Sequence, residues 1–336
     1  MRALVLLLAL APFAAEAQVQ APMIRDVVED HILPGFAALD TSAAGLAAAA
    51  QADCAPEAAP LRAAYGAAFD AWVSVSHLRF GPTETGDRAF ALAFWPDPRG
   101  ATPEALRKLI LDADPASFRA ETFSGASIAA RGFYAMEFLL YDPAFADPGR
   151  AEDRCALIRA VATDIAANAT AIDADWRGGY GDLLMTAGAN DRYRNPAEAT
   201  QELYKALTSG LEFLSDTRIG RPLGTFDAPR PTRAEARRSG RSQRQVVLSL
   251  AALHDLAARL APAEAAFTPR LIAAFDRAER QAAALDDPAF AGIADPQGWL
   301  KLEVLQQSVE AIREIVAADL GPALGVAAGF NAQDGD

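Results

Sequence analysis

Apolar and polar positions alternate along most of this chain with the period of an α-helix. Apolar residues recur at i, i+3 and i+4 through long Ala-rich stretches, and runs of β-branched residues are few. Such spacing gathers the apolar side chains on one face of each helix, where they can pack against neighbouring helices. The pattern predicts an all-α protein.

Proline, glycine and capping residues divide this pattern into two sets of four long helices. A connector rich in Gly, Asn and Asp at 178–195 separates the sets, and Thr232–Glu235 is interpreted as a capping box. We therefore expect two antiparallel four-helix bundles, with a signal peptide at 1–17, a first bundle at 18–190 and a second at 191–336. The expected helices are 21–50 with a break near Pro34, 60–80, 125–142, 151–176, 196–214, 232–260, 262 or 269 to 285, and 296–321.

The stretch 125–142 carries a carboxylate, Glu137, inside an otherwise apolar helical run. Phenols stand one turn away on either side, at Tyr134 and Tyr141. A helix of this composition is buried nearly all round, and a buried carboxylate must be paired, hydrogen-bonded or protonated. The rest of the chain should therefore supply a partner for Glu137.

An excess of positive charge occurs at 230–244, where six arginines fall on and before an expected helix start. The helix macrodipole disfavours cations there, so something anionic should compensate them. One interpretation places Arg237, Arg238, Ser239 and Ser242 against the Glu137 region. The alternative is that the arginines pair with acidic neighbours on a solvated face.

The N-terminus predicts export. Met1-Arg2 is followed by an apolar run at 3–13 and by Ala15-Glu16-Ala17, the layout of a secretory signal peptide cut after Ala17. The alternative is an uncleaved membrane anchor. No later stretch reaches about 18 apolar residues without a charge, so we expect no transmembrane segment in the mature chain and a periplasmic location.

Two cysteines remain after the predicted leader. In an up-and-down bundle Cys54 and Cys155 lie at helix junctions of the same pole. An oxidising compartment then favours a disulfide, which would stabilise the fold by on the order of 4 kcal/mol. The alternative is a pair of buried free thiols.

Charge and motifs narrow the function classes. With 31 basic and 44 acidic residues the net charge is −13, which argues against nucleic acid and anionic membranes and leaves metal cations or basic ligands compatible. The three histidines, His31, His77 and His254, lack the HExxH spacing of metalloproteases, and no nucleophile elbow or phosphate-binding loop occurs. Each histidine is interpreted as a core or surface residue.

The C-terminal segment combines apolar anchors with oxygen ligands. Leu324, Val326 and Phe330 could dock the segment, and Asn331 and Asp334 would then bring hard oxygen groups to the docking point. The alternative is a disordered end.

Five separated stretches resemble the imelysin-like family: the run GFYAMEFLL, the AW…FGP segment at 71–82, FWPDPRG at 94–100, AEARRSGRS at 234–242 and LGVAAGFNAQDGD at the end. The resemblance covers nearly the whole mature chain. It implies two four-helix bundles, export, tail docking on the first bundle and an association with iron uptake or regulation. The family is also grouped with metallopeptidases. Its GxHxxE motif lies on a helix of the first half, facing the contact between the bundles.

This chain departs from that motif. The glutamate carries over to Glu137, but the histidine position holds Tyr134, and a phenol is a poor ligand for divalent metals unless a hard ferric ion lowers its pKa. We therefore expect a non-catalytic periplasmic binding protein with a pocket where Glu137, Tyr134 and the tail meet. Iron or another divalent or trivalent metal at Glu137, a small ligand and an envelope protein are the candidate occupants. The alternatives are a metal-dependent peptidase with Glu137 as general base and a structural interaction module.

Overall fold

The computed structural model describes residues 20–326. These residues form helices joined by loops and contain no strand; the one extended pairing is an isolated bridge between Thr225 and Ala228. The all-α fold class is confirmed. The predicted signal peptide, 1–17, and the tail residues Asn331 and Asp334 lie outside the described residues, so those expectations stay predictions.

The longer helices are, in chain order, α2 (Leu33–Ala52), α3 (Ala59–Val75), α5 (Ala101–Asp112), α7 (Gly132–Tyr141), α8 (Ala151–Asp175), α10 (Pro196–Glu212), α12 (Ser242–Leu260), α13 (Thr268–Ala283) and α14 (Pro296–Ile315). Shorter ones are α4 (Arg88–Leu92), α6 (Ala120–Phe123), α9 (Gly181–Met185), α11 (Gly220–Leu223) and α15 (Gly321–Ala323). The 3-10 turns are η2 (Gly81–Thr83), η3 (Thr85–Asp87), η4 (Pro115–Phe118), η5 (Ile128–Ala130), η6 (Pro143–Phe145), η9 (Pro231–Arg233) and η10 (Ala291–Ala294). The π-helical turns are η1 (Val28–Ile32), η7 (Trp176–Tyr180), η8 (Phe213–Ile219) and η11 (Val316–Leu320).

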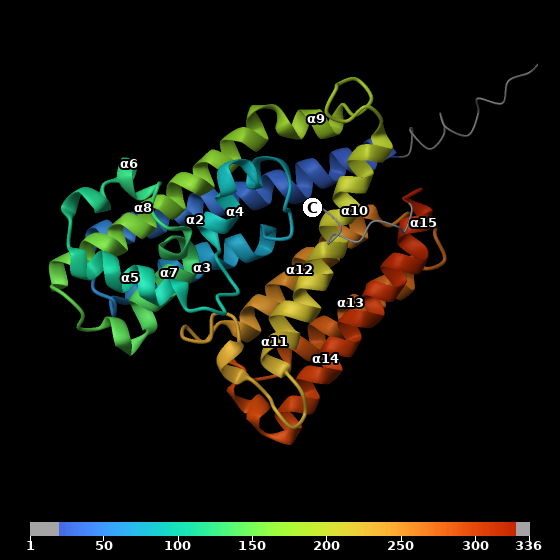
Figure 1. The fold of residues 1–336 in the computed structure, drawn as a ribbon. Helices are drawn as coiled ribbons and strands as arrows, with labels where there is room; N and C mark the ends of the chain where they lie inside the picture. Colours follow the sequence, from blue (N-terminus) through green and yellow to red (C-terminus); the bar gives the residue numbers. More distant parts are fainter. Residues whose placement is uncertain (1–19, 327–336) are drawn as a thin grey trace, which may run out of the picture.

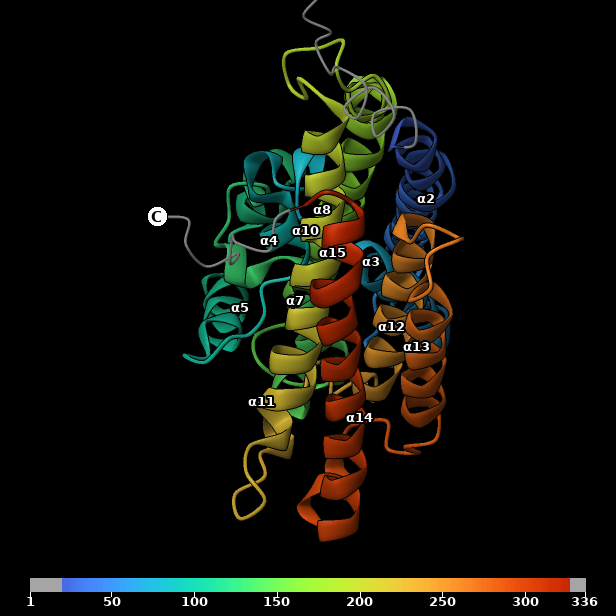
Figure 2. The same cartoon turned by 90° about the vertical axis from the view of Figure 1, so that its right-hand side faces the viewer.

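The helices lie in two groups that follow the order of the chain (Figure 1). In the first group α2 packs against α3 and α8, and α7 packs against α3 and α8. In the second, α12 packs against α10 and α13, and α14 packs against α13 and α10. Figure 2 shows these four helices of the second group running alongside one another. The boundary at residue 190 and the description as two four-helix bundles stay predictions.

The two groups meet where α3 packs against α12. This pairing brings the middle of α3 and the central helix α7 close to the start of α12, which lies far along the chain (Figure 1). Side chains from both groups are therefore buried against one another at this junction.

The first helix continues through Pro34 and runs without interruption from Gln20 to Ala52. Pro34 has no N–H to donate, and in an ordinary helix its ring also crowds the preceding turn. The π-helical turn η1 lies directly before it and widens the helix there. The expected break is thus replaced by a local bulge, which carries His31.

The predicted central helix is shorter than the apolar pattern indicated. Residues 125–131 form a bend and the 3-10 turn η5, and α7 begins at Gly132. Gly132 has φ of 75°, and a Cβ there would collide with the carbonyl oxygens of Ala91 and Leu92. The close approach of this backbone therefore requires glycine and ends the helical pattern on its N-terminal side.

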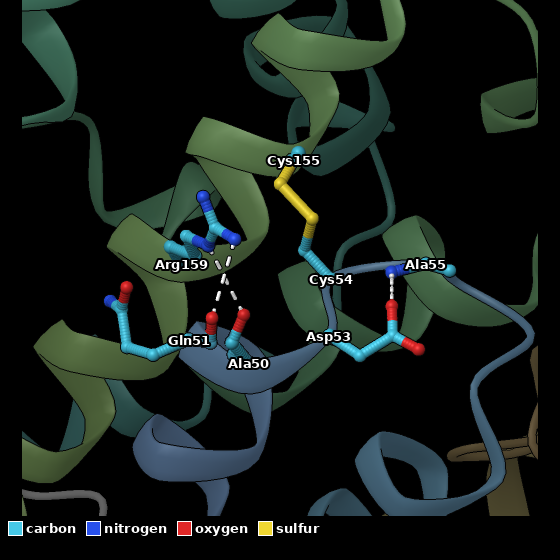
Figure 3. The surroundings of a disulfide bond; sticks show 7 residues. All are labelled: Ala50, Gln51, Asp53, Cys54, Ala55, Cys155 and Arg159. Carbon is cyan, nitrogen blue, oxygen red and sulfur yellow. Dashed lines mark hydrogen bonds between the residues drawn. A yellow bond between two sulfur atoms is a disulfide. The ribbon is translucent and has the colours of Figure 1, made fainter.

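Cys54 and Cys155 form a disulfide, with their Cα atoms 5.3 Å apart. Figure 3 shows the bond joining the segment after α2 to the start of α8. Beside it the guanidinium of Arg159 donates to the backbone oxygens of Ala50 and Gln51, at 3.2 and 3.3 Å, and so caps the end of α2. The disulfide prediction is confirmed.

Two continuous helices, Gln20–Ala52 and Ala151–Met185, are long and apolar enough to cross a membrane by length and composition alone. Both contribute side chains to the core, and α2 and α8 within them pack against each other. Buried core helices of this length and composition pass the same test, so the finding is weak evidence for a membrane span.

Candidate functional site

The central helix α7 holds Glu137 at the junction, with 2% of its surface exposed. Its Oε1 accepts hydrogen bonds from the backbone N–H of Ser239, at 2.9 Å, and from the Ser239 hydroxyl, at 2.8 Å. Ser239 precedes α12 in the second group, so this contact joins the two groups. The expected burial and hydroxyl partner of Glu137 are confirmed, whereas its role in binding stays a prediction.

Burial raises the pKa of Glu137, because the charged form loses its hydration. The two hydrogen bonds from Ser239 oppose this rise, and the nearby charges of Arg238 and Arg237 oppose it further. The backbone N–H and the hydroxyl of Ser239 therefore hold the Glu137 carboxyl group in buried surroundings that make its ionisation costly.

The other side chains expected beside Glu137, those of Arg237, Arg238 and Ser242, form no hydrogen bond with it among the described residues. Arg238 donates to Asp142 at 2.6 Å and lies over the Phe138 ring, with its guanidinium carbon 3.7 Å from the ring centre. Ser242 instead donates to the backbone oxygen of Glu235 at 2.6 Å. The Nε of Arg237 is buried without a hydrogen-bond partner among the described residues. Of the side chains expected there, Ser239 alone is seen to hydrogen-bond to Glu137.

The segment 234–241 is a compact loop rather than the start of a helix. Its backbone closes through the N–H of Arg241, which donates to the oxygen of Ala236 at 2.9 Å, and both Ala236 and Gly240 have positive φ. The capping-box interpretation of Thr232–Glu235 is therefore wrong, since α12 begins only at Ser242. The loop lets Ser239 reach Glu137 while Glu235 reaches a second residue of α7.

That second contact is between Glu235 and Tyr134. The Tyr134 hydroxyl donates to Oε1 of Glu235, and Arg218 Nε donates to Oε2 at 2.7 Å. With its nitrogen turned toward Glu235, the Gln245 amide adds bonds of 3.1 and 2.6 Å; the opposite orientation would set its oxygen against the carboxylate. Arg218 also donates to the hydroxyl of Ser249. Glu235 and Arg218 are 2% and 5% exposed, so this is a buried, hydrogen-bonded ion pair.

The donor set at the altered motif does not fit a metal ion. Burial, and then the charge of Glu235, raise the pKa of Tyr134 well above its ordinary value, so the phenol keeps its proton. A metal-bound phenol would have to lose it. Glu137 is held by Ser239, and Tyr134 uses its hydroxyl hydrogen on Glu235. No step involving a metal at Tyr134 or Glu137 follows from this arrangement.

A cavity of about 270 Å³ opens beside Tyr134 at the junction of the two groups. It lies between the end of α3, the loop around Trp95, and helices α10 and α12. Trp95 stacks against Tyr134, with ring centres 6.1 Å apart, and meets Phe213 edge-on at 6.0 Å. The aromatic side chains of the lining are Trp72, Phe80, Phe90, Trp95, Tyr134 and Phe213.

Polar groups from both groups of helices line the same cavity. Arg218 and Glu235 contribute their ion pair, and His77, Lys205 and Ser249 lie among the lining residues. The loop that carries Trp95 is fixed by Asp97, whose carboxylate accepts from the first backbone N–H groups of α5 at 2.9 and 2.8 Å. The cavity therefore combines aromatic walls with a small number of positioned polar groups, as ligand sites do.

The fold brings together histidines that the sequence left apart. His31 Nε2 and His77 Nε2 are 2.9 Å apart, and His31 Nδ1 is 2.7 Å from Oδ2 of Asp255. Burial lowers the pKa of His77 well below its ordinary value, and the charges of His31 and Arg218 lower it further. Spacing rules look along a single helix, so they could not reveal this arrangement of three separate segments.

His254 lies elsewhere, between α12 and α13. Its Nδ1 is 2.9 Å from Oε1 of Glu279, and its ring stacks on Phe275 at 4.9 Å. With Asp276 these side chains form the one group of at least three His, Cys, Asp or Glu residues within the described part of the chain whose ligand atoms are close enough to hold a metal. Glu137 does not belong to that group.

Sequence reasoning thus missed Glu235, Arg218 and His77 as site residues. A signal was present for two of them, because Glu235 lies in the AEARRSGRS stretch and His77 in the segment 71–82 that carried the family resemblance. Arg218 had no such signal, since it was assigned to a loop and lies instead in the π-helical turn η8.

Comparisons with known proteins agree with the fold. The sequence model of the family described as Imelysin matches residues 32–316. An imelysin-like protein from Psychrobacter arcticum 273-4 superposes with a TM-score of 0.76 at 21% identity, over 94% of this chain and 98% of that chain. A protein from Parabacteroides distasonis ATCC 8503 described as an iron-regulated protein A precursor superposes with a TM-score of 0.71 at 13% identity, over 89% and 94%. No curated protein matches the chain.

Proposed function

Because the chain belongs to the imelysin family, we propose that it is a periplasmic, non-catalytic binding protein that holds a small ligand at the junction of its two groups of helices. We further propose that its role is connected with iron uptake or regulation. Two facts support the proposed location and the connection with iron. The N-terminal sequence has the layout of a cleavable signal peptide, and a structure of the same fold is described as an iron-regulated protein A precursor.

The observation that carries the proposal is the cavity beside Tyr134. Both groups of helices line it, so a ligand inside it would contact α3 and the Trp95 loop on one side and α10 and α12 on the other. Apolar walls with convergent polar groups are the usual features of a small-molecule site. We propose that the polar pocket expected between the groups is this cavity, whose lining includes Tyr134 but not Glu137.

The metal-dependent hydrolase alternative receives less support from the same residues. A general base must be within hydrogen-bond reach of the water it activates and must be free to take its proton. The Oε1 of Glu137 already accepts two hydrogen bonds from Ser239. The metal content of the purified protein separates the readings: stoichiometric zinc would favour the hydrolase, and iron would favour the uptake role.

Calorimetric titration of the mature protein with ferric citrate tests the binding role directly. We expect one site, and we expect Ser209→Trp, which places a large ring in the cavity wall on α10, to weaken binding at least tenfold. Gln307→Trp is the matched control, because it adds the same ring to an exposed position of α14. Equal binding by both variants would place the site elsewhere. Absence of binding by any metal or small probe would favour the structural interaction module.

A further inference from the structure

A chain of hydrogen bonds leads from the surface of α12 to the cavity. Asp255 of α12 bonds His31 of η1 at 2.7 Å, and His31 bonds His77, in the turn after α3, at 2.9 Å. The side chain of His31 is 7% exposed and His77 is 6% exposed, so both rings are buried. His77 lines the cavity, and the Asp255–His31–His77 chain therefore connects the ligand site to an acidic group across the junction.

The chemistry of the two rings fixes which nitrogens carry hydrogen. A carboxylate only accepts, so His31 Nδ1 must donate to Asp255. When both rings are neutral, His31 Nε2 then has a lone pair and His77 Nε2 must donate to it. This leaves His77 Nδ1 as an acceptor, and no hydrogen bond to that atom is found within residues 20–326.

One added proton changes His77 Nδ1 from a hydrogen-bond acceptor into a donor. Whether the charge rests on His31 or on His77, the hydrogen bond between the rings survives only if His77 Nδ1 carries a hydrogen. The Asp255 carboxylate lies 2.7 Å from His31 and so stands beside the pair, and burial lowers the pKa of His77. Although burial raises the pKa of Asp255, its hydrogen bonds from His31 and Arg259 lower that pKa to about 2, so the carboxylate stays charged.

The other charged groups around the chain are largely paired. Arg259 bonds Asp255 at 3.0 Å and also pairs with two acids of the first helix, and Arg218 pairs with Glu235. Lys205 lines the cavity and has no ion-pair partner among the described residues. The other charged or titratable groups that line the cavity are Arg79, Tyr134, Glu202, Lys205, Arg218 and Glu235. Beside His31, Asp255 belongs to an ion-pair cluster with Arg259, Asp26 and Asp30.

An acid with a planar aromatic body matches this arrangement. Trp95 and Phe213 offer ring faces and edges, while Lys205 and a protonated His77 offer a cation and a donor for a carboxylate. A neutral His77 presents only a lone pair at Nδ1 and would repel the same anion. Binding of the anion and protonation of the two histidines therefore favour each other.

We infer that the cavity binds aromatic carboxylates as anions and that the Asp255–His31–His77 chain takes up one proton from solvent when they bind. This inference rests on the proposed function, because it names the ligand class of the same cavity. No covalent bond changes; the proton moves from water to the histidine pair, and Asp255 holds the resulting charge.

Calorimetry with 2-naphthoate tests the ligand class and the proton together. Titrations in buffers of different ionisation enthalpy at pH 8 should give an uptake of about one proton per bound 2-naphthoate, and affinity should fall about tenfold per pH unit above the range where the pair titrates. The neutral isostere 2-naphthamide should bind at least tenfold more weakly. Asp255→Asn should abolish the proton uptake, whereas the control His254→Gln should leave it unchanged.

The outcomes separate the inference from the proposed function. Binding of 2-naphthoate without proton uptake, or equal binding of the amide, would overturn the inference and leave the cavity as a ligand site. Binding of ferric citrate alone, lost in Ser209→Trp, would overturn the ligand class only. Nitrogen-15 NMR gives a test without ligand: at pH 8 we expect hydrogen on His31 Nδ1 and His77 Nε2, and the opposite tautomers would also overturn the inference.

Discussion

Glu137 and Glu235 are both buried glutamates at the junction of the two groups of helices, but they are held in different ways. Glu137 accepts two hydrogen bonds from one serine, and its pKa is raised by burial. Glu235 forms an ion pair with Arg218, accepts from Tyr134, and lines the cavity. The first glutamate is buried in the contact between the groups, whereas the second lines the cavity. Tyr134, which replaces the motif histidine, donates its hydroxyl hydrogen to Glu235 and lines the same cavity.

The largest expected effect is that of Arg218→Ala on the cavity side. Removing one partner of a buried ion pair leaves the other charge uncompensated, so the free energy of unfolding should fall by roughly 3 to 5 kcal/mol. Urea denaturation measures it. Arg270→Ala is the control, because Arg270 pairs with Asp319 at the surface and should contribute less than about 1 kcal/mol. Equal losses in the two variants would show that Glu235 is not held as described.

Glu137→Gln should have a smaller effect, a loss of about 1 to 3 kcal/mol from underpaired groups in the buried contact. The folded-state pKa of Glu137 is raised, so the stabilisation from its bound proton is present at low pH and lost as the pH rises through that pKa. Gln does not titrate. The advantage of the wild-type protein over the variant should therefore shrink as the pH rises above the ordinary range of a glutamate, as measured by denaturation at several pH values.

Asp142→Asn should show the opposite pH dependence of the stability difference from the wild-type protein. Although burial raises the pKa of Asp142, the hydrogen bond from Arg238 lowers it overall. Its stabilisation is thus present above the unfolded-state pKa and lost as the pH falls through the folded-state pKa. The advantage of the wild-type protein over this variant should grow with pH. The same pH dependence of stability in Glu137→Gln and Asp142→Asn would contradict the distinction between a buried, hydrogen-bonded carboxylate and an ion-paired one.

Tyr134→Phe should cost about 1 kcal/mol, because it removes one hydrogen bond while Glu235 keeps Arg218 and Gln245. The midpoint of urea denaturation, with an unchanged slope, is the measurement. A loss as large as that of Arg218→Ala would mean that the phenol, rather than the guanidinium, holds Glu235. No loss would mean that water replaces the hydroxyl.

The remaining expected effect is a gain in metal binding. Tyr134→His restores the family spacing of His and Glu on α7, and we expect zinc binding to tighten by about tenfold, roughly 1.4 kcal/mol. Calorimetric titration with zinc compares the variant with the wild-type protein, in which binding should be weak. Tight binding by the wild-type protein that disappears in Tyr134→Phe would make the phenol a ligand and would contradict the separation of the two glutamates.

The sequence predicted those features that depend on local pattern. The periodicity of apolar residues predicted an all-α chain, and the helix junctions at Cys54 and Cys155 predicted the disulfide. The apolar run around Glu137 predicted its burial, because a carboxylate in such a run has no route to water. These inferences needed only residues close in sequence or at one end of a helical set.

The cavity could not be predicted in the same way, because its residues meet only after the two groups of helices pack. Glu235 matched a capping box that the positive φ of Ala236 prevents. His31 and Arg218 lie in π-helical turns, which place side chains away from the 3.6-residue faces that a sequence pattern assumes. The same tertiary packing brings His31 to His77 and Arg218 to Glu235.

The disulfide closes a covalent ring over 101 residues of sequence separation. Tyr134 and Glu137 lie inside this ring, whereas Glu235 and Ser239 lie outside it. When the molecule is pulled by its two ends, tension passes through the sulfur bridge and the ring stays slack. Fully extended chain spans about 3.3 to 3.6 Å per residue, so roughly 350 Å of length is withheld from force until the bridge is reduced. The two sides of the junction between the groups of helices thus differ mechanically: one is carried on a shielded loop and the other on the stretch of chain that bears the load.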